Sequence, residues 1–130
     1  MALKSAGFTL IEVLVAVLIV AILVGVAYPS YQQYVSRAYR VEAHMQLSQI
    51  ANLQEQYFLD NLSFTGDLTD LGFAANPLLS DSGRYQISAT INNGRYSLKA
   101  VAQGSQATLD EGCDTLQLTM EGQKVPQECW

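Results

Sequence analysis

The chain has 130 residues, of which 49% are hydrophobic, and its formal net charge at pH 7 is −5. This length accommodates one compact domain plus one extended element. The acidic balance gives no overall field that favours nucleic acid or an anionic membrane surface. The sequence has no nucleophile–base pair, metal-ligand cluster or phosphate-binding glycine loop, so we expect no enzymatic activity, no cofactor and no bound metal.

The first element is a long apolar stretch. The hydrophobic residues are concentrated between Phe8 and Tyr28, after a short segment, Met1–Gly7, that carries one positive charge at Lys4. About 20 apolar residues are enough for a helix to cross a hydrocarbon core of ~30 Å. Lys4 favours a cytoplasmic N-terminus, and no ordinary secretory cleavage site follows the stretch. On hydropathy alone the simplest interpretation is a signal anchor.

Glu12 does not fit a simple anchor, because it is a carboxylate within the apolar stretch. Such a group costs about 2.5–3.5 kcal/mol at the bilayer centre and less near the interface. One interpretation places Glu12 among the headgroups without a role. In the other, the chain is cut after Gly7, the new amine on Phe8 lies one helical turn from Glu12, and Glu12 of one copy neutralises the amine of the next.

The segment Gly7–Glu12 (GFTLIE) resembles the prepilin peptidase motif of type IV pilins and pseudopilins. The resemblance implies cleavage between Gly7 and Phe8 on the cytoplasmic face, N-methylation of Phe8 by the same peptidase/N-methyltransferase, and a role for Glu12 in assembly. It divides the chain into a leader (residues 1–7), a transmembrane and filament-core helix (8–29) and a periplasmic pilin head domain (30–130).

The helical pattern continues beyond the apolar stretch. Pro29 lacks a backbone donor and Gly25 weakens the same turn, so a kink is predicted there. Tyr31–Asp60 contains no Gly or Pro and predicts a continuing helix, whose buried stripe is interrupted by Gln54. The stripe consists of Ala43, Leu47, Ile50, Ala51, Tyr57 and Phe58. Arg37, Arg40, Glu42 and His44 are expected to form a solvated face.

The rest of the chain predicts a small sheet. Asn61–Gly83 is rich in turn formers and indicates a surface connection, with Leu68, Leu71 and Phe73 tucked against the core. Alternating apolar residues then predict strands, and Asn92-Asn93-Gly94 predicts a hairpin turn. The predicted strands are Arg84–Ile91, Arg95–Ala102, Leu116–Met120 and a short one at Lys124–Val125. We therefore expect an α+β, type IV pilin fold: a long N-terminal helix packed on an antiparallel sheet of three to four strands.

The two cysteines, Cys113 and Cys129, are predicted to form one structural disulfide, because an exported domain folds in an oxidising compartment. The bridge would close a loop of about 17 residues, worth roughly 3 kcal/mol in the chain-entropy model. It would fasten the C-terminal tail to the sheet.

The resemblance extends along the whole chain and is greatest to PilE-like minor pilins. It rests on Glu55–Phe58, Asn61–Thr65 and the Cys113–Leu116 segment with Cys129-Trp130. It implies a pilus subunit, expected to be a minor one, in the inner membrane and in the extracellular filament of a Gram-negative-type bacterium. The implied partners are other pilin subunits, prepilin peptidase, the inner-membrane assembly platform and membrane lipid. Adhesion and twitching motility are among the functions such a pilus serves.

One alternative, implied by the same resemblance of the N-terminal motif, is a pseudopilin of a type II secretion system. The major form of such a pseudopilin is stabilised by calcium. Asp110, Glu111 and Asp114 are the candidate calcium ligands. Their spacing is not that of a recognised calcium loop, so an acidic surface loop is expected instead.

The other alternative is a DNA-uptake receptor pilin. Such a protein needs a basic stripe with interleaved aromatic residues, and several residues of this kind surround the first hairpin: Arg84, Tyr85, Arg95, Tyr96 and Lys99. Acidic residues nearby dilute any positive field, so nucleic acid is not the expected partner.

Overall fold

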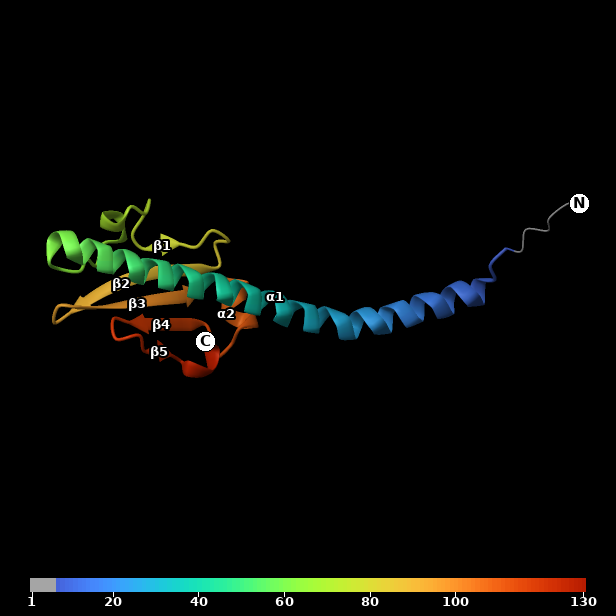
Figure 1. The fold of residues 1–130 in the computed structure, drawn as a ribbon. Helices are drawn as coiled ribbons and strands as arrows, with labels where there is room; N and C mark the ends of the chain where they lie inside the picture. Colours follow the sequence, from blue (N-terminus) through green and yellow to red (C-terminus); the bar gives the residue numbers. More distant parts are fainter. Residues whose placement is uncertain (1–6) are drawn as a thin grey trace, which may run out of the picture. The chain divides into compact units, whose positions relative to one another are not determined.

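The computed structural model describes residues 7–130, so residues 1–6 of the predicted leader lie outside the described residues. The chain divides into two compact units at Tyr34 and Val35. From here on, "the head" means the second unit, Val35–Trp130, and not the predicted domain 30–130. It contains all of the sheet and the C-terminal part of the long helix (Figure 1).

The long helix, α1, spans Leu10–Asn61, close to the predicted end at Asp60. It is helical without interruption through Gly25 and Pro29. The kink at these residues therefore stays a prediction. The helix ends where Leu62 adopts a left-handed φ of 54° and its N–H donates to the carbonyl oxygen of Phe58 at 2.8 Å. This is a C-terminal cap formed without glycine.

The sheet has five antiparallel strands in the order β1-β2-β3-β4-β5. Their bounds are β1 Leu78–Leu79, β2 Tyr85–Asn92, β3 Arg95–Ala102, β4 Thr115–Thr119 and β5 Lys124–Val125. Three to four strands were predicted, and the additional strand is β1, which pairs Leu78 with Ile87. It has only two residues and lies between turn formers, so no alternation could indicate it.

The hairpin turn between β2 and β3 forms where the sequence predicts it. Asn92 pairs with Arg95, and the two residues between them have positive φ, 52° for Asn93 and 75° for Gly94. Two positive φ values in a two-residue loop match the twist of the flanking strands.

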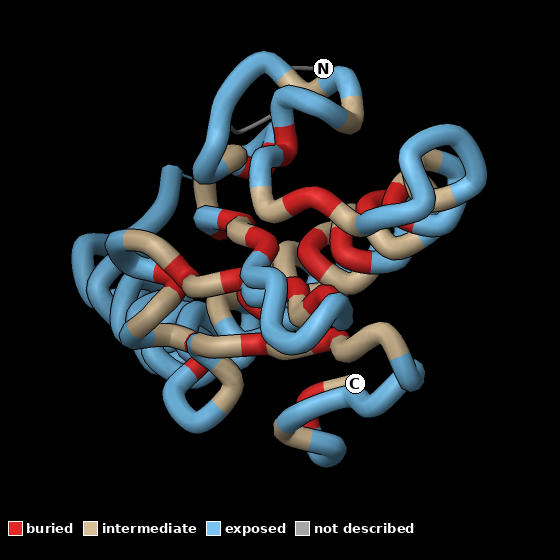
Figure 2. Tube along the Cα trace, turned by 90° about the vertical axis from the view of Figure 1, so that its left-hand side faces the viewer, coloured by how far each residue is buried: buried red, intermediate tan, exposed pale blue. Residues whose placement is uncertain are grey.

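The core lies between α1 and one face of the sheet, and the buried segments gather there in Figure 2. Ala43, Leu47 and Ile50 of the predicted stripe are fully buried. Leu68 is also fully buried and packs with Leu71 and Phe73, as predicted for the connection. Three short helices lie outside the predicted helix and strands: η1 Leu68–Leu71, α2 Ser105–Leu109 and η2 Gln127–Cys129.

Gln54 is part of the buried face rather than an interruption of it, and its exposed fraction is 0%. Its amide nitrogen donates to the carbonyl oxygen of Thr65 at 2.6 Å, and its amide oxygen accepts from the Thr65 N–H at 3.1 Å. One side chain thus satisfies both backbone groups of a buried loop residue. Hydropathy could not predict this, because the partner is a backbone 11 residues away.

Replacing Gln54 by Leu should destabilise the head by about 1–3 kcal/mol, because both backbone groups of Thr65 would be buried without partners. Gln56→Leu is the matched control, since Gln56 is exposed on the same helix. Urea unfolding of the detergent-solubilised chain measures the difference. Equal midpoints for the two variants would show that the Gln54 amide does not hold the loop.

Candidate functional site

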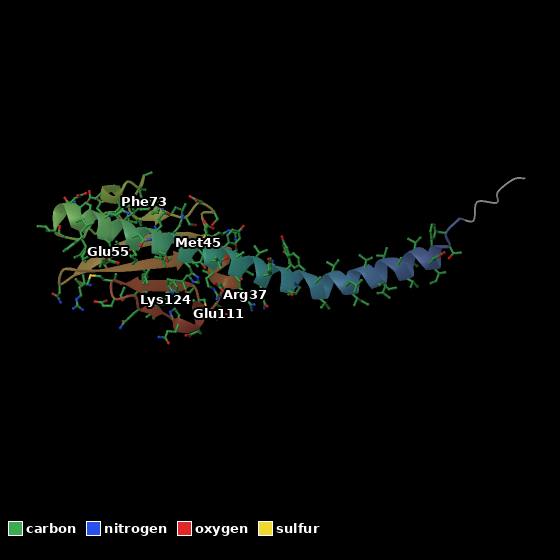
Figure 3. The ribbon with its side chains drawn as sticks, in the orientation of Figure 1. Arg37, Met45, Glu55, Phe73, Glu111 and Lys124 are labelled. Carbon is green, nitrogen blue, oxygen red and sulfur yellow. A yellow bond between two sulfur atoms is a disulfide. The ribbon has the colours of Figure 1, made fainter. Side chains whose placement is uncertain are left out.

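The apolar part of α1 is exposed in the part of the chain that the structure describes, residues 7–130. Thr9 caps its N-terminus, because the Thr9 hydroxyl accepts from the Glu12 N–H at 3.3 Å. Beyond the cap the large apolar side chains are at least 47% exposed, and Leu10 reaches 81%. Figure 3 shows the side chains of this segment projecting outward from the helix ribbon. Among residues 7–130, α1 is the one helix long and apolar enough to cross a membrane.

Glu12 lies in the first turn of this helix, where the exposed N–H groups and the helix dipole favour a negative charge. Gly7 and Phe8 precede the helix in exposed, non-helical backbone, and Phe8 is 82% exposed. A peptidase needs an accessible backbone, and the Gly7–Phe8 bond lies in exposed, non-helical backbone.

Within the head, a buried polar network joins α1, near Ser36, to α2 and the residue that follows it. The Arg40 guanidinium forms a two-point ion pair with Asp110, whose side chain is 5% exposed, and the Arg40 Nε donates to Asp110 Oδ2 at 2.7 Å. Gln106 of α2 donates to the carbonyl oxygen of Ser36 at 2.8 Å and to the Tyr85 hydroxyl at 3.0 Å. The hydrogen bond from Arg40 to Asp110 raises the pKa of Arg40, and burial raises the pKa of Tyr85.

The ion pair corrects two expectations from the sequence. Arg40 is not part of a solvated face, and Asp110 is not in an exposed acidic loop, because each is the partner of the other across 70 positions. The Asp110 carboxylate, which the calcium interpretation required as a ligand, is bonded to Arg40 instead. Within the described residues 7–130, no group of three His, Cys, Asp or Glu side chains is placed to hold a metal ion.

The C-terminal tail is fastened to the head at two points. The predicted disulfide between Cys113 and Cys129 is present, with a Cα–Cα distance of 5.6 Å. The Trp130 ring stacks on His44 of α1 with ring centroids 4.3 Å apart. His44 is therefore also not part of a solvated face. His44 and Trp130 border an open groove of about 560 Å³. Met45 of α1 and Lys124 of β5, labelled in Figure 3, also line this groove.

Burial lowers the pKa of His44 below its ordinary value of 6.5, and the Arg40 charge lowers it further. The unfolded chain therefore binds more protons than the folded one just below pH 6.5, so the free energy of unfolding should fall as pH decreases through this range. His44→Gln should reduce this dependence between pH 7 and 5. Thermal melts of both proteins across that range test it, and parallel curves would exclude His44 as the titrating group.

The strand positions on the outer face of the sheet, which points away from α1, include no Asp or Glu. Strand registers place Ser88, Lys99 and Gln117 in one row across β2, β3 and β4. The strand residues of this face are Leu79, Gln86, Ser88, Thr90, Asn92, Arg95, Ser97, Lys99, Val101, Thr115, Gln117, Thr119 and Val125. At one end of the face, Arg95 forms an ion pair of 2.8 Å with Glu121, which lies in the turn after β4. Residues 35–130 contain six Lys and Arg against eleven Asp and Glu, because only Lys4 and Glu12 precede them. The absence of Asp and Glu from these strand positions is therefore unusual for this head.

Two family descriptions match the sequence. Residues 3–28 match the prokaryotic N-terminal methylation motif. Residues 29–117 match a family described as "Type IV minor pilin ComP, DNA uptake sequence receptor".

Curated relatives and a solved structure that resemble this chain are also named as fimbrial proteins or type IV pilins. A fimbrial protein of Pseudomonas aeruginosa is 33% identical, over 82% of this chain and 73% of the relative. The type IV major pilin protein PilE1 of Neisseria gonorrhoeae is 33% identical, over 75% of this chain and 59% of the relative. The structure of a type IV pilin from Shewanella oneidensis superimposes with a TM-score of 0.53 at 26% identity, covering 73% of this chain and 97% of that one.

Proposed function

The chain belongs to the type IV pilin family, and we propose that it acts as a minor subunit of a pilus, held in the inner membrane by α1 until it is assembled. The observation that carries the proposal is the apolar, uncovered segment of α1 with Glu12 in its first turn. Apolar side chains exposed over this length need either lipid or other copies of the helix around them. A pilin uses both in turn.

Processing at the N-terminus would prepare the helix for assembly. We propose that prepilin peptidase cuts between Gly7 and Phe8 and that the amine of Phe8 is then N-methylated. The support is the match of residues 3–28 to the methylation motif and the exposed, non-helical backbone at this bond. The new ammonium group on Phe8 would lie one helical turn from Glu12. An ion pair with Glu12 of a neighbouring copy would neutralise both charges within the apolar filament core.

The remaining parts of the chain fit the same role. The head would face the periplasm, where the Cys113–Cys129 bridge is stable. A loosened turn at Gly25 and Pro29 would let the helix adapt to its neighbours in the filament. The partners would be major and minor pilins and the inner-membrane assembly platform, and a structural role of this kind needs no catalytic site or cofactor.

Fractionation of the native host tests this function. With an antibody against the head, the chain should appear in sheared filaments of the wild type. In a strain without prepilin peptidase it should be confined to the inner membrane. A chain that never enters filaments would contradict the proposal even if it remained in the membrane.

A second candidate function is DNA reception at the outer face of the sheet. The family matched over residues 29–117 is described as a DNA uptake sequence receptor. Hydroxyl, amide and lysine side chains, as found around Lys99, are the groups that contact DNA phosphates. The excess of acidic residues elsewhere in the head opposes this function.

Binding of labelled duplex DNA to the purified chain, measured over a series of salt concentrations, decides the second function. If the outer face binds DNA, Lys99→Glu should abolish binding and Lys124→Glu, in the groove near α1, should leave it. Affinity should also fall as salt is raised, because phosphate contacts release counterions. No binding by the wild type at low salt would eliminate this function and leave the pilin assignment intact.

A further inference from the structure

Three tyrosines lie together just beyond the apolar stretch. The chain has seven tyrosines, and Tyr28, Tyr31 and Tyr34 fall within seven consecutive positions. Their exposed fractions are 59%, 65% and 74%. Between Val13 and Ala27 there is no tyrosine and no charged side chain. The aromatic residues therefore begin where the purely apolar sequence ends.

The three phenols share one side of the helix. Residues three apart on an α-helix lie close to the same face, so Tyr28, Tyr31 and Tyr34 form a stripe along α1. Gln32 donates to the Tyr28 hydroxyl at 2.9 Å, which ties one phenol to an amide. Ser30, Gln32 and Gln33 supply polar groups around the rest of this turn. The stripe thus combines apolar rings with a turn of the helix that is rich in polar side chains, and the Tyr28 hydroxyl is bonded to one of them.

The distance along the helix from Glu12 places the stripe at a second boundary. Tyr28 and Tyr34 follow Glu12 by 16 and 22 positions, which corresponds to about 24 and 33 Å at 1.5 Å per residue. The hydrocarbon core of a bilayer is ~30 Å thick. When the Glu12 carboxylate lies at one interface, the tyrosine stripe therefore lies at the other. Arg37 follows Tyr34 by three positions and would be a cation on the aqueous side.

We infer that Tyr28, Tyr31 and Tyr34 form an interfacial anchor that binds the boundary between phospholipid headgroups and acyl chains and fixes the depth of α1 in the membrane before assembly. The inference rests on the proposed function, because it requires α1 to reside in a bilayer. Tyrosine is enriched at this boundary since its ring is apolar and its hydroxyl is hydrated. The order apolar, aromatic with amide, then cationic follows the polarity gradient of a membrane interface. This order favours lipid over a second copy of the helix as the partner of the stripe.

Depth-dependent quenching tests the anchor in the full chain. Single tryptophans are introduced as Tyr31→Trp and, as the control at the centre of the apolar stretch, Leu18→Trp, both with Trp130→Phe. The variants are reconstituted in phosphatidylcholine–phosphatidylglycerol vesicles with bromines at shallow or deep positions of the acyl chains. Shallow bromines should quench position 31 most strongly, and deep bromines should quench position 18 most strongly. The chain with its native Trp130, measured alone and subtracted, provides the same comparison should Trp130→Phe disturb the head.

Replacing the tyrosines shows whether they hold the helix at its depth or only lie near the interface. Changing all three tyrosines to Ala should shift the quenching of position 18 toward shallow bromines, because the helix would no longer be held at its depth. Changing all three to Phe, which keeps the rings, should shift it less. An unchanged profile in the Ala variant would overturn the anchor.

The other outcomes also discriminate. If position 31 is unquenched by lipid yet shielded from aqueous acrylamide, a second copy covers the stripe and the anchor is wrong. If deep bromines quench position 31 best, the stripe lies inside the hydrocarbon core of the bilayer and the anchor is again wrong. If position 18 is unquenched at every depth, α1 is not in the bilayer, and the proposed function fails together with the inference.

Discussion

Replacing Asp110 by Asn should destabilise the head by about 3–5 kcal/mol, because it leaves the Arg40 guanidinium without its counter-charge in a site where both side chains are mostly covered. The side chain keeps its size, so lost packing would not explain the effect. Glu111→Gln is the matched control, since Glu111 is the exposed neighbour of Asp110. Unfolding in urea, followed by near-ultraviolet circular dichroism, gives the difference.

A double replacement separates the ion pair from other causes of instability. Arg40→Met combined with Asp110→Leu removes both charges, and apolar pairs in such positions are often no less stable than the ion pair. The double variant should therefore recover most of the loss seen with Asp110→Asn. Failure to recover would mean that the Asp110 carboxylate is needed by another group, with the Tyr85 hydroxyl 3.5 Å away as the first to examine.

Replacing Glu12 by Ala should leave the chain in the membrane and sharply reduce its entry into filaments. The helix gains apolar character, so insertion is not impaired, while the partner for the Phe8 amine of the next copy is lost. A lost pair worth about 1.4 kcal/mol would reduce each addition step roughly tenfold. Glu12→Asp, which keeps the charge, should assemble better than Glu12→Gln, which keeps the length. Quantitative blots of sheared filaments against membranes measure the ratio, and normal assembly of the Ala and Gln variants would refute the pairing of Glu12 with the amine.

The sequence predicted those features that depend on local pattern. Alternating apolar residues located both ends of β2, β3 and β4 to within one residue, and Asn93 and Gly94 of the predicted turn have the positive φ values that it requires. The helix stripe at Ala43, Leu47 and Ile50 is buried as predicted. In each case the signal lies in neighbouring residues whose period or backbone preference is specific to the element.

Features formed by distant polar residues could not be predicted in the same way. Arg40 and Asp110 each resemble ordinary surface charges until the fold brings them together, and composition cannot indicate which charges will pair. Gln54 was treated as a break in a hydrophobic stripe, yet it is fully buried because Thr65 supplies partners for its amide. Buried polar side chains are defined by their partners, so they become predictable only when the partners are placed.

The measurement that tests the central claim most directly is the intact mass of the native chain, compared between sheared filaments and the inner membrane. If the chain is a processed pilus subunit, the filament fraction should contain a form lacking Met1–Gly7, with one added methyl group and a closed Cys113–Cys129 bridge. A full-length, unmethylated chain found only in the membrane would contradict the account and leave α1 as a simple membrane anchor.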